Sequence, residues 1–282
     1  MNFKSFLLPL CIALFCIGIS QAQGFRQRLK IQSEALNGNL INDPSNRDVT
    51  IYLPPSYQTN RDKTYPVLYL LHGFTDTDNK WFGRERHWIN MYDILNTSIA
   101  NGTSKEFIVV MPNAYTTYKG SFYSSSKTNG DWETFITKEL VDFIDNRFRT
   151  IPNAKSRGLA GHSMGGYGTL RLAMKYPDVF SSIYVLSACC MDDSFIPNAA
   201  QIKNMEAVKY KFNIADLDFV ESINLAFSAA WASNPKNAPL YIDLPYKDGI
   251  LRPEILQKFS ENQILHMVNP YLSNLKNLRL LL

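Results

Sequence analysis

The sequence is poor in the residues that bind metals and build disulfide frameworks. Its 282 residues include four cysteines and four histidines, and none of them has the spacing of a zinc or iron–sulfur site. Cys11 and Cys16 lie in an apolar N-terminal segment, which leaves Cys189 and Cys190 for the folded domain. A disulfide between adjacent residues needs a strained ring, so we expect two free, buried thiols that pack as small apolar side chains. We expect no metal ion and no cofactor.

Blocks of basic residues and long apolar runs are also lacking. Lys and Arg number 29 against 25 Asp and Glu, which gives a net charge of +4 without a basic run, so no nucleic-acid partner is expected. The apolar run 6–19 is shorter than the about 20 residues of a membrane-spanning helix. With Lys4 before it and SQA (20–22) after it, the run predicts a signal peptide over 1–22. We expect a periplasmic or secreted mature chain with no stable membrane insertion after cleavage.

No repeat or low-complexity segment occurs, and short β-rich runs alternate with helical patterns. The alternation predicts one α/β domain over 23–282, with a mostly parallel central sheet flanked by helices. The predicted strands span 26–36, 47–54, 66–73, 107–112, 156–162, 181–188 and 277–282. Helices are predicted around 88–99, over 131–148 with Asp131 as its cap, and from the end of the fifth strand to about Tyr176. Between 189 and 275 the strand pattern stops, which predicts an aromatic-rich, partly helical insert after the sixth strand.

Residues 161–165, Gly-His-Ser-Met-Gly, stand at the junction of a predicted buried strand and a helix. This is the G-x-S-x-G pattern of a nucleophile elbow, in which a serine occupies a strained turn. Side chains two positions either way would collide with the neighbouring strand and helix, which explains the glycines. Ser163 is therefore the candidate nucleophile, and a Gly-rich turn with an incidental serine is the alternative.

Acyl transfer also requires N–H donors for the tetrahedral oxyanion. One candidate is the backbone of Met164, the residue after the nucleophile. The other lies in LLHGF (70–74) after the third strand, where we choose the N–H of Phe74, with Thr75 next.

Four segments resemble the esterase D-like branch of the α/β-hydrolases, which includes S-formylglutathione hydrolases, feruloyl and acetyl-xylan esterases and mycolyltransferases. They are YPVLYLLHGF (65–74), FIVVMPNAY (107–115), WETFITKELVDFIDNRFRT (132–150) and RGLAGHSMGGYGTLRLAMKYPDVFSSIYVLSA (157–188). The resemblance implies an α/β-hydrolase fold, with Ser163 as nucleophile and the backbone N–H groups of Phe74 and Met164 as the oxyanion hole.

The same resemblance implies an acid after the seventh strand and a histidine after the eighth, and the sequence stops inside its seventh strand. We therefore expect the last strand and helix to be missing, as in a fragment of a longer esterase, and the chain as given to be inactive. His266 alone among the histidines follows the nucleophile. It is the candidate base, with a structural histidine at a helix end as the alternative. Asp192 and Asp193, after the sixth strand, are candidate acids or plain loop carboxylates.

These features predict an exported serine carboxylesterase that hydrolyses an acyl ester through an acyl-enzyme. The aromatic-rich insert suits an aryl or sugar ester, such as a feruloyl or acetyl ester of a polysaccharide. Two alternatives stay open. One is acyl transfer to a sugar hydroxyl, and the other is a catalytically dead, esterase-like carbohydrate-binding module.

Overall fold

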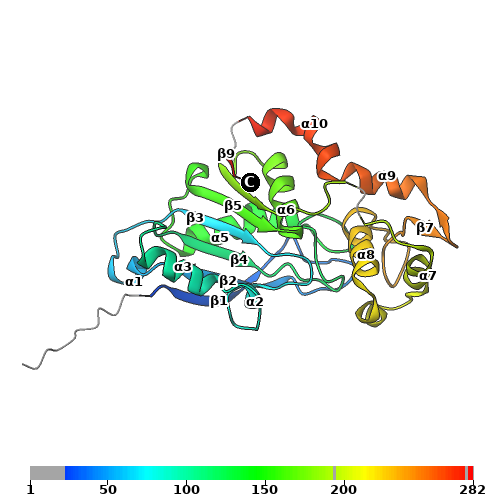
Figure 1. Cartoon of the computed structure of the whole chain (residues 1–282), viewed down its shortest axis with the longest axis horizontal. Coiled ribbons are helices and arrows are strands. Elements are labelled where there is room, and N and C mark those ends of the chain that lie inside the picture. Colours follow the sequence, from blue (N-terminus) through cyan, green and yellow to red (C-terminus); the bar gives the residue numbers. More distant parts are fainter. Residues whose placement is uncertain (1–22, 193–194, 277–278, 282) are drawn as a thin grey trace, which may run out of the picture.

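A computed structural model describes residues 23–192, 195–276 and 279–281. The predicted signal peptide, 1–22, lies outside the described residues. Over the described part, a seven-stranded sheet carries helices on its faces and a helical insert at one end (Figure 1). Its strands are β1 (Phe25–Gln32), β2 (Asn46–Leu53), β3 (Val67–Leu71), β4 (Ile108–Pro112), β5 (Arg157–His162), β6 (Ser182–Leu186) and β9 (Arg279–Leu281). Each lies within or overlaps a predicted strand.

The helices that cover the sheet are α1 (Ser56–Thr59), α2 (Asp78–Trp81), α3 (Met91–Ala100), α4 (Trp132–Thr134), α5 (Leu140–Arg147) and α6 (Met164–Lys175). A π-helical turn, Phe135–Glu139, joins α4 to α5, and a 3-10 turn, Ala154–Ser156, precedes β5. The Asp131 side chain accepts a hydrogen bond from the Thr134 N–H, which confirms the predicted cap. The helix predicted from residue 88 begins only at Met91, because Asn90 is an extended N-cap residue. Trp88 therefore lies outside that helix and is 70% exposed.

The order of strands across the sheet is β1-β2-β4-β3-β5-β6-β9. β1 and β2 form the predicted antiparallel pair, β2 is antiparallel to β4, and the remaining neighbours are parallel. Leu71 at the end of β3 is in register with Gly161 near the end of β5. The loops after these two strands therefore leave the same edge of the sheet side by side.

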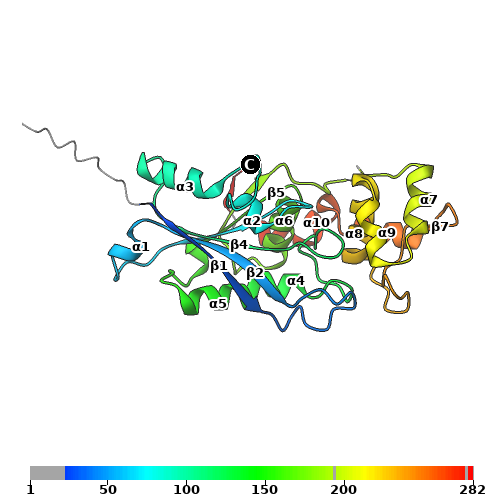
Figure 2. The same ribbon diagram turned by 90° about the horizontal axis from the view of Figure 1, so that it is seen from below.

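Successive side chains of a strand point to opposite faces of the sheet, and both faces are covered. In β3, Tyr69 and Leu71 belong to the larger core, which also contains residues of α5 and α6, whereas Leu70 packs in a second core with Trp81 and Leu95. Figure 2 shows α3 and α5 on opposite sides of the sheet. Burial on both faces explains the nearly continuous apolar runs that predicted central strands.

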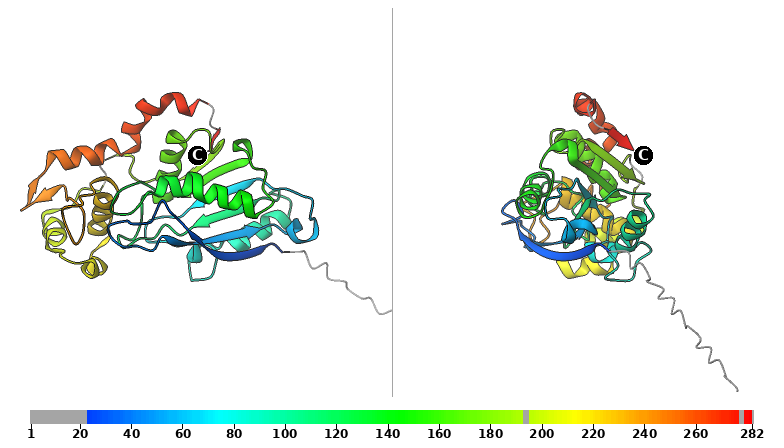
Figure 3. Two further views of the ribbon diagram at one scale, coloured as in Figure 1. Left: turned by 180° about the vertical axis from the view of Figure 1, so that it is seen from behind. Right: turned by 90° about the vertical axis from the view of Figure 1, so that its left-hand side faces the viewer.

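The insert after β6 contains α7 (Ala199–Ala207), a 3-10 turn at Lys211–Asp216, α8 (Phe219–Trp231), α9 (Pro253–Glu261) and α10 (Ile264–Leu275). It lies beyond the carboxyl ends of the parallel strands, and α10 returns alongside α6 (Figures 1 and 3). The sequence pattern missed the short helices α1, α2 and α7, and it also missed a short hairpin of β7 (Tyr246–Lys247) and β8 (Ile250–Leu251). Asp248 and Gly249 between them both have positive φ, as an Asp-Gly hairpin turn requires. No helix among the described residues has both the length and the apolarity to cross a membrane.

Candidate active site

Ser163 occupies a strained turn between β5 and α6. Its φ is 53° and its ψ is −113°, a backbone conformation that side-chain-bearing residues rarely adopt. The Ser163 N–H donates to Leu186 O at 2.9 Å, and its carbonyl accepts from the Tyr167 and Cys189 N–H groups at 3.0 and 3.2 Å. These hydrogen bonds fix the turn to both β6 and α6. A turn with an incidental serine does not explain why a serine, rather than a glycine, holds the left-handed position.

The flanking glycines are required by close backbone approach. A Cβ at Gly161 would lie 2.2 Å from Gly165 O, and a Cβ at Gly165 would lie 2.0 Å from Leu71 O. At Gly166 it would lie 2.9 Å from Ala188 Cα. The neighbouring atoms are backbone and cannot rotate away, so α6 packs against β3, β5 and β6 at a distance that only glycine allows.

The side chains of Phe74 and Met164, whose N–H groups are the proposed oxyanion donors, both lie next to Gly120. A Cβ at Gly120 would lie 2.6 Å from Met164 Sδ and 2.7 Å from Phe74 Cδ2. Within the described part of the chain, neither the Phe74 N–H nor the Met164 N–H donates to a protein acceptor. The Thr75 N–H, in contrast, donates to Lys119 O at 3.1 Å. Thr75 is therefore occupied, and the geometry favours Phe74 as the second donor.

His72 holds the loop that presents Phe74. The ring is completely buried: Nε2 accepts from the Ala114 N–H at 2.8 Å, and Nδ1 lies 2.9 Å from Gly73 O, to which it donates. The carbonyl of His72 accepts from the Tyr123 hydroxyl at 3.0 Å. Burial lowers the pKa of His72, so the ring stays neutral and keeps one acceptor and one donor nitrogen.

Two histidines that precede the nucleophile form a cluster beside it. His87 Nε2 lies 3.2 Å from Asp76 Oδ1, and the other carboxylate oxygen accepts from Trp81 Nε1 at 3.0 Å. The His162 ring packs against Trp81 and Trp88, with centroids 5.9 and 5.7 Å apart. The pairing of His87 with Asp76 could not be predicted from the sequence, because both residues precede Ser163 and the expected order is serine, acid, histidine.

His266, the sequence candidate for the base, is exposed at the start of α10. Its Nε2 lies 3.1 Å from the hydroxyl of Ser260 in α9. The structure therefore pairs His266 with a serine of the insert, and among the described residues no hydrogen bond joins its ring to Ser163. Asp192 is exposed and lines a cavity of the insert, and Asp193 lies outside the described residues.

That cavity has a volume of about 300 Å³ and is largely apolar. Its aromatic walls are Phe195, Phe227, Trp231, Tyr246 and Phe259. Cys190 also lines it, and the preceding Cys189 N–H bonds to Ser163 O, so the cavity adjoins the turn of the nucleophile.

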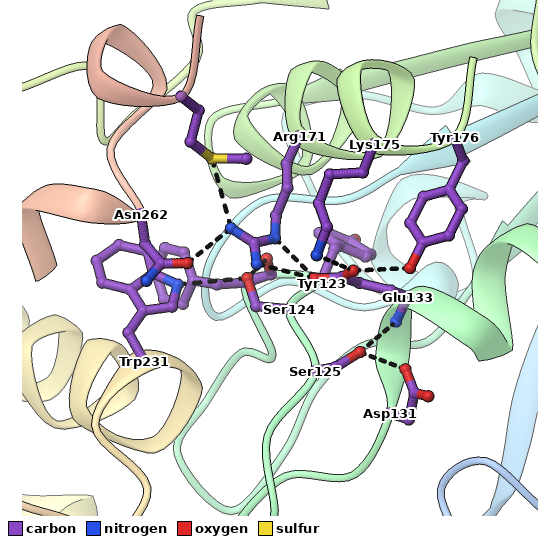
Figure 4. Close-up of polar contacts among 12 residues, drawn as sticks. Tyr123, Ser124, Ser125, Asp131, Glu133, Arg171, Lys175, Tyr176, Trp231 and Asn262 are labelled. Carbon is purple, nitrogen blue, oxygen red and sulfur yellow. Dashed lines mark hydrogen bonds and ion pairs between the residues drawn. The ribbon is translucent and has the colours of Figure 1, made fainter. Parts of the chain in front are cut away.

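A buried ion-pair network anchors α6 behind the nucleophile (Figure 4). Arg171 Nη2 lies 2.8 Å from Glu133 Oε1, and Lys175 pairs with the other carboxylate oxygen. Arg171 also donates to Asn262 Oδ1 at 2.8 Å, which links α6 to the insert. Burial works to raise the pKa of Glu133, but the charges of Arg171 and Lys175 outweigh it and lower the pKa.

The mostly parallel sheet, its flanking helices and the serine turn are those of an esterase-type α/β structure. The chain belongs to the family described as "Putative esterase", which matches residues 43–262. A solved structure described as "ferulic acid esterase" superimposes with a TM-score of 0.54 and 26% identity, over 70% of this chain and 78% of that one. S-formylglutathione hydrolase of Staphylococcus aureus shares the fold, with a TM-score of 0.53 and 18% identity over 92% of this chain and 78% of that one.

Curated relatives point to the same family. The "Endo-1,4-beta-xylanase/feruloyl esterase" of Xylanibacter ruminicola is 32% identical over 191 residues, which cover 66% of this chain and 25% of that protein. "Esterase Rv1288" of Mycobacterium tuberculosis is 36% identical over 139 residues, or 49% of this chain and 28% of that protein. S-formylglutathione hydrolase of Bos taurus is 28% identical over 148 residues, or 50% and 51%. The chain thus spans between a quarter and about half of the length of these relatives.

Proposed function

We propose that the protein is a serine carboxylesterase that forms an acyl-enzyme on Ser163. The observation that carries the proposal is the left-handed backbone of Ser163, held by hydrogen bonds to β6 and α6. Such strain costs about 1–3 kcal/mol and clusters at active sites. Membership of the esterase family supports the same chemistry.

In the proposed reaction, Ser163 Oγ attacks the carbonyl carbon of the ester. The negative oxygen of the tetrahedral intermediate accepts hydrogen bonds from the Phe74 N–H in the loop after β3 and from the Met164 N–H at the start of α6. The N-terminal end of α6 adds a favourable dipole. Collapse expels the alcohol and leaves the acyl group on Ser163, and water then attacks the acyl carbon and releases the acid.

Across the described residues, no histidine or carboxylate hydrogen-bonds to the Ser163 hydroxyl, and an unassisted serine is a weak nucleophile at neutral pH. We therefore expect the chain to hydrolyse esters slowly.

For the substrate, we propose a feruloyl or acetyl ester of a polysaccharide. We also propose that residues 1–22 are removed on export and that the mature chain acts on this substrate outside the cytoplasm. The aromatic cavity beside the serine turn suits an aryl acyl group. Relatives described as a xylanase/feruloyl esterase and a ferulic acid esterase support that choice.

Product analysis tests the proposal. The chain and its Ser163→Ala variant are incubated with feruloylated and acetylated xylo-oligosaccharides, with and without excess free sugar, and the products are separated by mass. We expect slow release of free acid, lost in the variant. Transfer of the acyl group to the added sugar would show that the protein is an acyltransferase. Binding of the oligosaccharide without turnover in both proteins would identify a carbohydrate-binding module.

A further inference from the structure

Two adjacent cysteines follow β6 directly behind the serine turn. The Sγ atoms of Cys189 and Cys190 lie 2.7 Å apart. That separation is shorter than the roughly 3.5–4.0 Å at which non-bonded heavy atoms make their best contact. It is longer than the about 2.05 Å of a disulfide. Two thiols gain little at this distance, whereas a two-electron oxidation would let the sulfurs approach further and bond.

The backbone at the pair is already unusual. Cys190 has a φ of 61°, and Ser187, three residues earlier, has a φ of 44°. Neither position is a glycine, so the segment stores backbone strain of the kind that clusters at functional sites.

The pair touches the proposed nucleophile, the insert and the cavity. The Cys189 N–H donates to Ser163 O at 3.2 Å, and Cys190 O accepts from the Ile264 N–H at the start of α10 at 3.1 Å. The Cys190 side chain is buried and lines the aromatic cavity, while Cys189 is partly exposed. A change at the two sulfurs therefore reaches the turn of Ser163 through one hydrogen bond.

We propose that Cys189 and Cys190 are a modification site at which a vicinal disulfide forms, and that the closed ring stiffens the support of Ser163. The oxidant is a small disulfide such as oxidised glutathione. The thiolate of Cys189, the more exposed of the two, attacks one glutathione sulfur and expels a glutathione thiolate. Cys190 then passes its proton to the released glutathione thiolate, and its own thiolate attacks Cys189 Sγ and expels the second glutathione as a thiolate. One glutathione disulfide is reduced to two thiols as the two cysteines are oxidised.

Peptide mapping of the full chain tests whether the ring forms. Trypsin cleaves after Lys175 and next after Lys203, so one peptide contains Cys189 and Cys190 and no other cysteine. After equilibration with oxidised glutathione and alkylation of free thiols, we expect this peptide unalkylated and lighter by two hydrogens than its reduced form. Two alkylated thiols, or one or two bound glutathiones, would overturn the proposal. Cys189→Ser and Cys190→Ser are the matched controls and should carry glutathione or an alkyl group.

A second measurement tests the effect on Ser163, and it rests on the proposed function. We expect a fluorophosphonate probe to label Ser163 several-fold faster in the oxidised chain than after reduction. The Cys189→Ser/Cys190→Ser double variant should show no response to the reductant. Equal labelling rates of the oxidised and the reduced chain without substitutions would overturn the role of the ring in supporting Ser163.

Hydrogen exchange tests the stiffening of the segment without relying on the reactivity of Ser163. The segment 187–190 should exchange more slowly in the oxidised chain, whether or not Ser163 reacts with the probe. If the ring forms and slows exchange while Ser163 stays unlabelled, the proposed function fails and the modification site stands. Unchanged exchange would contradict the stiffening.

Discussion

At the residue scale, the candidate site depends on backbone groups that hydrogen bonds hold in place. Ser163 is strained, and hydrogen bonds to Leu186, Tyr167 and Cys189 maintain the strain. The oxyanion donors are likewise backbone N–H groups. Apart from Ser163 itself, whose hydroxyl is the proposed nucleophile, substitutions that change the backbone should therefore harm catalysis more than substitutions that remove only a side chain.

Phe74 offers a direct test of the oxyanion hole. Phe74→Pro removes its N–H, and the loss of one oxyanion donor costs about 10²–10³-fold in kcat in comparable enzymes. Phe74→Ala keeps the N–H but removes the ring that contacts Phe122 and Phe219. The rate of ester hydrolysis should fall far more in the proline variant than in the alanine variant, once circular dichroism shows that both fold. Equal rates would exclude Phe74 as a donor.

His72 predicts a pH dependence of stability. Its pKa is lowered by burial in the folded chain, whereas in the unfolded chain it lies near the ordinary value of about 6.5. Below that pH the unfolded state binds a proton that the folded state does not, so the free energy of unfolding falls as the pH falls. The slope from His72 is at most about 1.4 kcal/mol per pH unit.

Urea unfolding at several pH values between 7.5 and 5.5 measures this slope. His72→Gln is the control, because its side chain keeps an acceptor for the Ala114 N–H and does not titrate. The unmodified chain should lose stability more steeply than the variant. The same dependence of stability on pH in both proteins would show that protonation of His72 does not contribute to it.

At the scale of elements, the helix of the nucleophile is held by the network of Glu133, Arg171 and Lys175. The Glu133 side chain is 3% exposed, so its removal leaves two cations near the core without their partner. We expect Glu133→Gln to lower the free energy of unfolding by about 3–5 kcal/mol. Asp142→Asn, which breaks the exposed pair with Lys138, should change it little. Equal effects of the two variants in urea unfolding would contradict the structural role of the network.

Most of the elements could be predicted from the sequence, for physical reasons that vary along the chain. The strands β3 and β4 were visible because burial on both faces demands continuous apolar runs. The short hairpin of β7 and β8 was not, because two-residue strands leave no alternation to detect. The network around Glu133 was also invisible, since it joins residues 38 and more positions apart.

At the scale of the whole molecule, the sheet supplies the serine turn and the oxyanion loop, and the insert supplies the aromatic cavity. The sequence predicted Ser163, Phe74 and Met164 because these residues follow local patterns at strand ends. It did not predict the contact between Asp76 and His87, which depends on the path of the loop after β3. His266 stays an untested prediction as the base, and its position along the chain did not reveal that its ring contacts Ser260.

His266 can be tested separately from the nucleophile. Because its ring bonds to Ser260, we expect His266→Ala to leave the slow hydrolysis of p-nitrophenyl acetate unchanged, measured by release of p-nitrophenol. Asn262→Ala, which alters the same end of the insert, controls for indirect effects. Loss of hydrolysis in the histidine variant alone would make His266 the base after all.

The central claim is that Ser163 is the nucleophile, and mapping of a covalent label tests it most directly. The chain is treated with a fluorophosphonate probe, digested, and searched by mass spectrometry for modified serines, with Ser163→Ala treated in parallel. The account predicts that Ser163 is labelled in preference to every other serine and that the variant is not labelled, even if the reaction is slow without an assigned base. Labelling of a different serine, or equal labelling of the variant, would contradict it.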